Sequence, residues 1–179
     1  INPIDLKMVR STKTPDLVLG WDIAGVVDSV GSEVSLFKVG DEVYYAGSVI
    51  RPGGFSEFHI VDERIAGFKP KLLSFTQSAA LPLTSITSWE AMFEKMGAPQ
   101  KNTNNASLLV LGGAGGIGSI AIQLGANVAG LKVIASASSE QSRAQCLSMG
   151  ATKIIDHTSA LAPQIAALEI KSVDYILCA

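Results

Sequence analysis

The stretch that follows Leu111 carries the pattern G-x-G-x-x-G, with Gly113, Gly115 and Gly118 at the glycine positions. In such a turn the first glycine permits a tight bend and the second lets backbone N–H groups approach a diphosphate. The third lets the next helix lie close to the preceding strand. A helix that begins there adds unpaired N–H groups and the positive end of its dipole, and both attract phosphate. We therefore predict a nucleotide site built by Gly113, Ala114, Gly115, Gly116, Ile117 and Gly118.

The surroundings of this turn strengthen the prediction. The apolar run Ser107–Leu111 is typical of a parallel strand that is buried on both faces. Apolar residues then recur at helical spacing until Gly130, and a second apolar run covers Lys132–Ala137. This order predicts a β-α-β unit. A glycine turn that binds nothing remains the alternative, because the chain has 17 glycines.

The end of the second predicted strand bears on the choice of nucleotide. An NAD site has an Asp or Glu about 20 residues past the glycines, whereas an NADP site carries small polar and basic groups there. Here Ser136, Ser138 and Arg143 follow the strand, and their donors suit a 2′-phosphate. We therefore predict that these three residues bind NADPH. In the alternative reading, Ser138 and Gln141 form only a capping box and Arg143 is a solvated charge; Glu140 keeps this alternative open.

Bulk composition excludes several classes of partner. The chain has 179 residues, a net charge of −2 and a pI near 5.7, which argues against a nucleic-acid or anionic-membrane surface. No apolar run reaches the roughly 18 residues of a membrane-spanning helix. The two cysteines, Cys146 and Cys178, form no C-x-x-C pair, so we expect a reducing, cytoplasmic location.

Residues 1 to about 75 are predicted to be β-rich. Short strands separated by turns are typical of a partly closed barrel. Ser74 and Gln77 predict a capping box for a short helix that Pro82 ends, and a longer helix follows until Gly97. The expected strands are Ile23–Val30, Val43–Ala46 and Phe58–Val61 in this part, and 107–111, 132–137, 152–155 and 173–178 in the rest.

Several further stretches occur in a characteristic order along the chain: Asn2–Asp5, Lys38–Val43, Tyr45–Gly47, Phe55–Arg64 and Ala79–Thr87. This order resembles the medium-chain dehydrogenase/reductases, and above all their quinone oxidoreductase branch labelled zinc-type alcohol dehydrogenase-like. The resemblance implies an α/β chain with a GroES-like, partly open β-barrel over residues 1–85, lacking its N-terminal strands. The first half of a Rossmann domain, a doubly wound parallel sheet, is expected over 86–179. A homodimer is implied for the full-length protein.

Zinc ligands of the alcohol dehydrogenases are absent from the matching positions. Asn2 stands where the resemblance places a Cys, Trp21 and Asp22 replace a His-Glu pair, and Leu83 lies near the last ligand. An amide and an indole are poor zinc ligands, so we predict no metal. His59 and His157 are interpreted as packed or surface residues rather than ligands.

The resemblance implies hydride transfer from NADPH to a quinone or an α,β-unsaturated carbonyl. Tyr45 is the candidate proton donor, with water or a plain packing role as alternatives. Asn2 would lie beside the nicotinamide, or would be an ordinary turn residue before Pro3. Thr87 resembles a nicotinamide-contacting threonine, although its hydroxyl could equally bond within its own helix.

Three other functions remain open. Zinc-type alcohol dehydrogenase activity is one alternative. A methyltransferase also uses a glycine-rich first turn, but it usually has an acidic residue at the second strand end. A protein that binds NADPH without turnover is the third.

Overall fold

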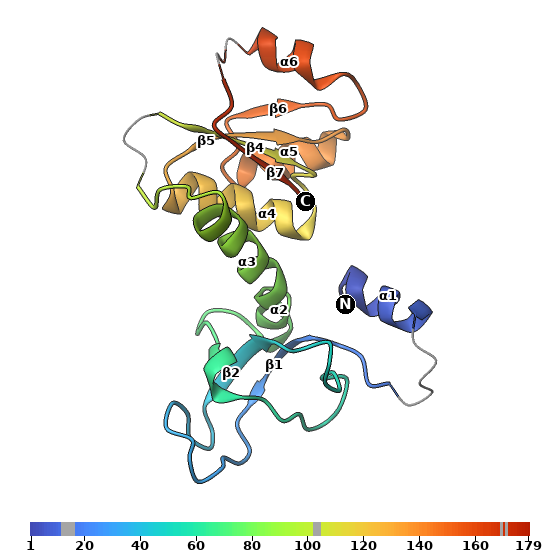
Figure 1. The fold of residues 1–179 in the computed structure, drawn as a ribbon, viewed down its shortest axis with the longest axis vertical. Coiled ribbons are helices and arrows are strands. Elements are labelled where there is room, and N and C mark those ends of the chain that lie inside the picture. Colours follow the sequence, from blue (N-terminus) through green and yellow to red (C-terminus); the bar gives the residue numbers. More distant parts are fainter. Residues whose placement is uncertain (12–16, 102–104, 169, 171) are drawn as a thin grey trace. The chain divides into compact units, whose positions relative to one another are not determined.

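The computed structural model describes residues 1–11, 17–101, 105–168, 170 and 172–179 (Figure 1). The chain divides into two compact units, Ile1–Leu83 and Thr84–Ala179. The boundary expected after residue 85 lies close to this division. Both an antiparallel and a parallel sheet are present, so the predicted α/β fold class is confirmed.

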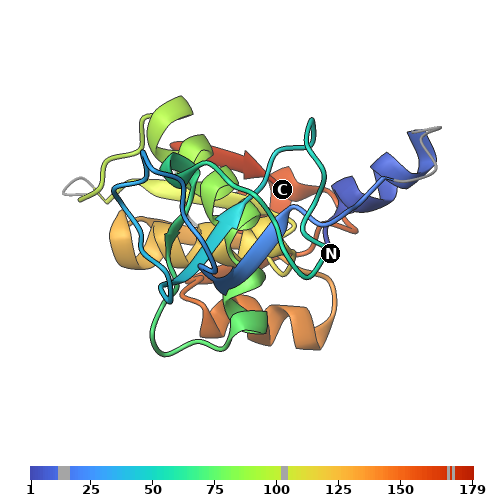
Figure 2. The same ribbon diagram turned by 90° about the horizontal axis from the view of Figure 1, so that it is seen from below.

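The first unit contains an antiparallel sheet in the order β1-β2-β3. Figure 2 shows β1 and β2 side by side, and their register places Ala24 opposite Tyr44. Alternation along β2 buries Val43 and Tyr45 on the same face. The strands are β1 (Asp22–Val26), β2 (Glu42–Ala46) and β3 (Gly67–Phe68).

Two expectations for this unit are wrong. Phe58–Val61 is not a strand, and the third strand is Gly67–Phe68 instead. Phe58 and Ile60 are largely exposed, because no neighbouring ladder among the described residues takes up this apolar segment. The strand expected to reach Val30 ends at Val26, and Asp28, Ser29 and Val30 are exposed.

Helices of the first unit follow local capping rules. The unexpected helix α1 (Pro3–Ser11) begins with proline at its first position, and Asp5 accepts a hydrogen bond from the Asn2 N–H. Helix α2 (Phe75–Ala79) has the predicted capping box of Ser74 and Gln77, and it packs against β1 and β2. The short 3-10 turn η1 covers Glu63–Ile65.

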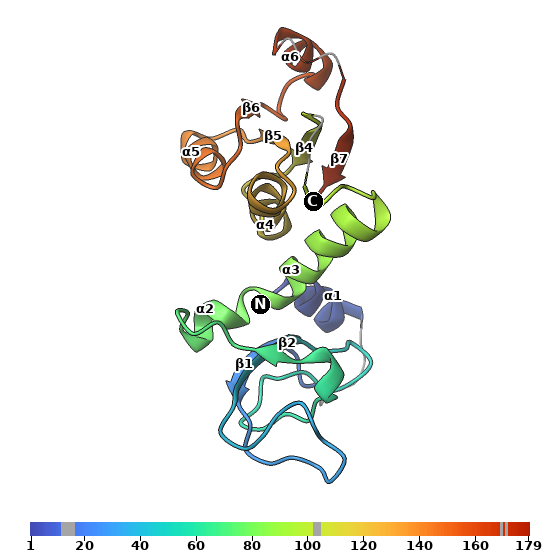
Figure 3. The same ribbon diagram turned by 90° about the vertical axis from the view of Figure 1, so that its left-hand side faces the viewer.

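The second unit is built on a parallel sheet in the order β6-β5-β4-β7. Figure 3 shows α4 and α5 on one side of this sheet and α6 on the other. The strands are β4 (Ser107–Leu111), β5 (Lys132–Ser136), β6 (Lys153–Ile155) and β7 (Tyr175–Cys178). The helices are α3 (Pro82–Trp89), α4 (Gly116–Gln123), α5 (Glu140–Ser148) and α6 (Leu161–Ala167), with π-helical continuations η2 (Glu90–Lys95) and η3 (Leu124–Val128).

Burial of this sheet on both faces explains its continuous apolar strands. Leu108 and Val110 pack into the core beneath α4 and α5, whereas Leu109 and Ile134 pack into the core beneath α6. All four side chains are at most 3% exposed. The predicted end of the first crossover helix is confirmed by Gly130, whose φ of 68° lies in the left-handed region. No helix among the described residues is both long and apolar enough to cross a bilayer.

Candidate functional site

The turn between β4 and α4 is shaped by backbone contacts. Gly112, rather than Gly113, makes the tight bend, because its φ is 77° and its backbone lies in the left-handed region. The N–H of Gly115 bonds to the carbonyl of Gly112 at 3.0 Å and closes the turn. Gly115 is the N-cap of α4 and, with Gly116, is exposed. The cradle predicted from sequence is therefore open to solvent.

Close packing explains the other two glycines. A side chain at Gly118 would clash with the carbonyl oxygen of Gly112, which confirms that only glycine lets this helix start lie against the strand end. A Cβ at Gly113 would lie 2.9 Å from both Ala135 Cβ and Cys146 Sγ. Gly113 therefore serves contact with β5 and α5, and the tight bend falls to its neighbour.

The first turn of α4 supplies the donors for an anion. An α-helix leaves its first N–H groups without acceptors inside the helix, and here these belong to Gly116, Ile117 and Gly118. The helix dipole adds positive potential at the same place. Helix α3 braces this start, because the Ser88 hydroxyl donates to the carbonyl of Ile117 at 3.1 Å. Thr87, the neighbouring candidate, is half-buried on α3.

The carboxyl end of β5 separates the predicted phosphate contacts into two groups. Ser136 is 1% exposed, and its hydroxyl accepts the N–H of Gly112 at 2.9 Å, so it shapes the glycine turn. Ser138 is exposed. The capping box that Ser138 and Gln141 offered as an alternative does not form, because Ser139 caps α5 and pairs with Ser142.

Arg143 is anchored at the carboxyl end of the sheet. Its Nη2 donates to Oδ2 of Asp156 at 2.7 Å, just beyond β6. Hydrogen bonds from the Thr158 hydroxyl and N–H lower the pKa of Asp156, and the Arg143 charge lowers it further. The guanidinium remains partly exposed, so its other donors can meet a ligand.

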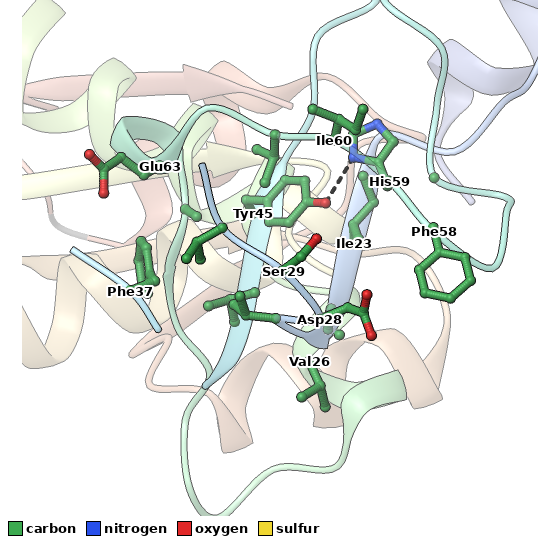
Figure 4. Close-up of a pocket in the computed structure, with 18 of the residues that line it drawn as sticks. Ile23, Val26, Asp28, Ser29, Phe37, Tyr45, Phe58, His59, Ile60 and Glu63 are labelled. Carbon is green, nitrogen blue, oxygen red and sulfur yellow. Dashed lines mark hydrogen bonds between the residues drawn. The ribbon is translucent and has the colours of Figure 1, made fainter. Parts of the chain in front are cut away.

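Tyr45 points into a pocket of about 560 Å³ in the first unit (Figure 4). Its hydroxyl lies 2.8 Å from Nδ1 of His59, whose Nε2 lies 3.0 Å from the carbonyl of Pro52. A carbonyl only accepts, so Nε2 donates to Pro52, and Nδ1 in that tautomer accepts the Tyr45 hydroxyl. Tyr45 is 5% exposed, and burial raises the pKa of its hydroxyl to about 12. His59 thus has a hydrogen-bonding role that sequence alone did not indicate.

Asn2 lies at a different cluster in the same unit. Its side-chain Nδ2 donates to Oδ2 of Asp22 at 2.8 Å, and Oδ1 of Asp22 accepts the N–H of Leu83 at 2.8 Å. The adjacent Trp21 is 2% exposed and directs its Nε1 to the Arg51 carbonyl. At the positions compared with zinc ligands, the Asp22 carboxylate thus accepts two N–H groups, one from Asn2 and one from Leu83. Within the described part of the chain, no group of three or more metal-ligating side chains occurs.

Family comparisons agree with both halves of the chain. Residues 1–71 match the alcohol dehydrogenase GroES-like domain, and residues 116–179 match the zinc-binding dehydrogenase family. A zinc-type alcohol dehydrogenase-like protein of Staphylococcus epidermidis is 39% identical over 99% of this chain and 54% of its own length. A 2-methylene-furan-3-one reductase of Solanum lycopersicum is 41% identical over 88% of this chain and 42% of its own length. The chain thus spans about half the length of the curated relatives it matches.

Solved structures give the same result. A Rhizobium etli protein of the zinc-dependent alcohol dehydrogenase type superposes with a TM-score of 0.92 and 47% identity, over 99% of this chain and 53% of that one. The Escherichia coli quinone oxidoreductase in complex with NADPH superposes with a TM-score of 0.79 and 29% identity, over 94% of this chain and 51% of that one.

Proposed function

The chain belongs to the medium-chain dehydrogenase/reductase superfamily, and from this premise we propose that its full-length protein is an NADPH-dependent oxidoreductase without a catalytic metal. The proposed acceptors are quinones and α,β-unsaturated carbonyl compounds. Two similar proteins support this class, one named a quinone oxidoreductase and one a 2-methylene-furan-3-one reductase.

The observation that carries the proposal is the exposed helix start behind a glycine turn. Any side chain at Gly118 would meet the Gly112 carbonyl, and Gly115 and Gly116 are exposed at the start of α4, where a ligand would bind. The donors that would hold a diphosphate are backbone N–H groups of the first turn. These features fit a dinucleotide, whose reduced nicotinamide supplies the hydride when bound.

Preference for NADPH rests on the groups that follow β5. No carboxylate stands between Ser136 and Ser139, so this segment lacks the acidic group that typically binds the ribose 2′-hydroxyl of NAD and would repel a 2′-phosphate. Ser138 offers an exposed hydroxyl, and Arg143 is held at the sheet edge by Asp156. Ser136 would act indirectly, because its hydroxyl accepts the N–H of Gly112 and so shapes the glycine turn.

Polarity at the reacting carbonyl would come from Asn2. The proton would come from water, because the Tyr45 hydroxyl is buried and already donates to Nδ1 of His59. An enone or quinone is already electron-poor, so hydrogen-bond donors can replace a Lewis acid. The Asn2 amide keeps a second N–H beyond the one donated to Asp22. Tyr45 keeps its proton well above neutral pH because burial raises its pKa to about 12.

A catalytic zinc does not fit the donor set. Asn2 and Leu83 offer an amide and an apolar side chain, and both oxygens of Asp22 already accept N–H groups. No step of the proposed reaction uses a metal.

The full-length protein is also proposed to be a cytoplasmic homodimer, which light scattering and fractionation would test.

The decisive experiment uses the full-length protein. NADPH and NADH are titrated by fluorescence, and NADPH oxidation is followed at 340 nm with a panel of quinones, enones, aldehydes and ketones. Tight NADPH binding with turnover of quinones or enones supports the proposal. Binding without any turnover identifies a non-catalytic NADPH-binding protein. Preferential binding of S-adenosylmethionine would instead identify a methyltransferase. Activity restricted to alcohols and dependent on zinc would identify a zinc-type alcohol dehydrogenase.

A further inference from the structure

Two carboxylates fix Asn2, one by bonding its backbone N–H and the other by bonding its side chain. Asp5 is 3% exposed, and its Oδ2 accepts the backbone N–H of Asn2 at 2.6 Å. The other oxygen of Asp5 accepts the N–H of Gly20 at 3.0 Å. The backbone of Asn2 is therefore fixed to the segment that leads into β1.

The second carboxylate fixes the side chain. Oδ2 of Asp22 lies 2.8 Å from Nδ2 of Asn2, and Oδ1 lies 2.8 Å from the N–H of Leu83. An ionised carboxylate only accepts hydrogen bonds, so the atom of Asn2 that faces it must be the amide nitrogen. This hydrogen bond therefore fixes the orientation of the Asn2 side-chain amide, with its nitrogen toward Asp22 and its oxygen away from it.

This arrangement leaves a defined pair of groups on Asn2. One N–H is used by Asp22, whereas the carbonyl oxygen and the other N–H keep fixed directions. A carboxamide or a ketone can pair with such an oriented amide. With a free rotation the two groups would exchange places, and half of the orientations would present the wrong group.

We propose that Asp22 is a positioning residue that sets the orientation of the Asn2 amide toward the carbonyl group of the substrate. This inference rests on the proposed function. It assigns Asp22, which stands where the family's metal-binding dehydrogenases have an acidic neighbour of a ligand, a task in hydrogen bonding. The competing role is a purely structural joint between α1, β1 and the start of α3.

The first test needs no turnover. In full-length protein labelled with ¹⁵N-asparagine, and without coenzyme, the Asn2 side-chain amide should give an N–H signal that exchanges slowly with solvent. Asp22→Asn should abolish this protection, because an amide at residue 22 has one accepting oxygen for two N–H groups. The matched control is Asp41→Asn, since Asp41 likewise accepts a backbone N–H, that of Lys38, on the surface of the same unit. Unchanged protection in Asp22→Asn would overturn the inference.

The second test is a double-mutant cycle on NADPH oxidation. Asp22→Asn and Asn2→Ala should each lower kcat about tenfold, and the double variant should be no slower than Asn2→Ala alone. Losses that multiply would show that Asp22 acts independently of Asn2, and a loss of thermal stability without a change in kcat would show a joint only. If Asp22→Asn does not fold, Asp22→Glu replaces it, because the longer side chain keeps the charge but displaces the acceptor. Wild-type protein that oxidises no NADPH would refute the proposed function, while the amide signal would still report on the orientation of Asn2.

Discussion

The hydroxyl of Ser136 accepts the N–H of Gly112 across 24 residues of sequence, at 2.9 Å. The carbonyl of Ser136 also accepts the N–H of Gly113 at 3.1 Å, so one residue at the end of β5 fixes two residues of the glycine turn. The side chain is 1% exposed, and water cannot replace it easily.

Ser136→Ala should lower the free energy of unfolding by about 1–3 kcal/mol, because the Gly112 N–H loses its buried acceptor. NADPH should bind a few-fold more weakly, since the turn is less fixed. Urea denaturation and fluorescence titration measure the two effects. Ser138→Ala, at an exposed neighbour, should leave stability unchanged. Equal stability of the two variants would contradict the buried contact.

Gly118→Ala should cost about 1–3 kcal/mol of stability and abolish tight coenzyme binding, because the new methyl group would meet the Gly112 carbonyl and push α4 away. Gly31→Ala is the control, since a Cβ at Gly31 meets no atom within 4 Å. Thermal melts of both variants, with and without NADPH, check the prediction. A Gly118→Ala protein that NADPH still stabilises would disprove the close approach.

Arg143→Ala should weaken NADPH binding about tenfold and leave NADH binding unchanged, because only the 2′-phosphate would meet the guanidinium. Lys153→Ala is the control. It removes an equal charge at the start of β6, whereas Arg143 contacts Asp156 beyond the other end of this strand, so it should affect the binding of neither coenzyme. Dissociation constants at fixed ionic strength give the comparison. Parallel losses for both coenzymes would rule out a 2′-phosphate contact.

Tyr45 should make stability depend on alkaline pH. Its folded-state pKa of about 12 lies above the ordinary value of 10.0, so the neutral side chain stabilises the fold fully below pH 10. That contribution should be lost as pH rises from about 10 through about 12. Urea midpoints across this range would show the decline. Tyr45→Phe should flatten it, and an unchanged slope in that variant would assign the decline to other groups.

Purified full-length protein should contain no stoichiometric zinc by plasma mass spectrometry, and chelators should leave NADPH oxidation unchanged. The physical reason is that both oxygens of Asp22 are engaged by Asn2 and Leu83. One zinc per chain, lost together with activity on dialysis against chelator, would reverse the conclusion.

Local sequence rules predicted the main elements of the second unit. The run Ser107–Leu111 is a strand with the predicted bounds, and Gly118 has the predicted packing role, because both depend on neighbours in sequence. The first glycine was misplaced by one position. The bend is made by Gly112, and nothing in a G-x-G-x-x-G pattern distinguishes a residue that turns from one that packs under Cys146.

Contacts between distant residues explain what sequence did not predict. Tyr45 meets His59 across 14 residues, and Asp22 meets Leu83 across 61, so neither pair produces a pattern that can be read locally. Helix α1 was missed although its start signals are local, namely proline at the first position and Asp5 three residues after Asn2. The segment Phe58–Val61 has the composition of a strand, but composition does not supply a neighbouring strand to pair with.

The donors proposed to hold a diphosphate are main-chain N–H groups at the start of α4, whereas the groups proposed to discriminate between coenzymes are side chains after β5. In the proposed site, phosphate binding and coenzyme specificity thus depend on separate segments. Substitutions after β5 alone should therefore exchange the coenzyme preference, with no change to the glycine turn.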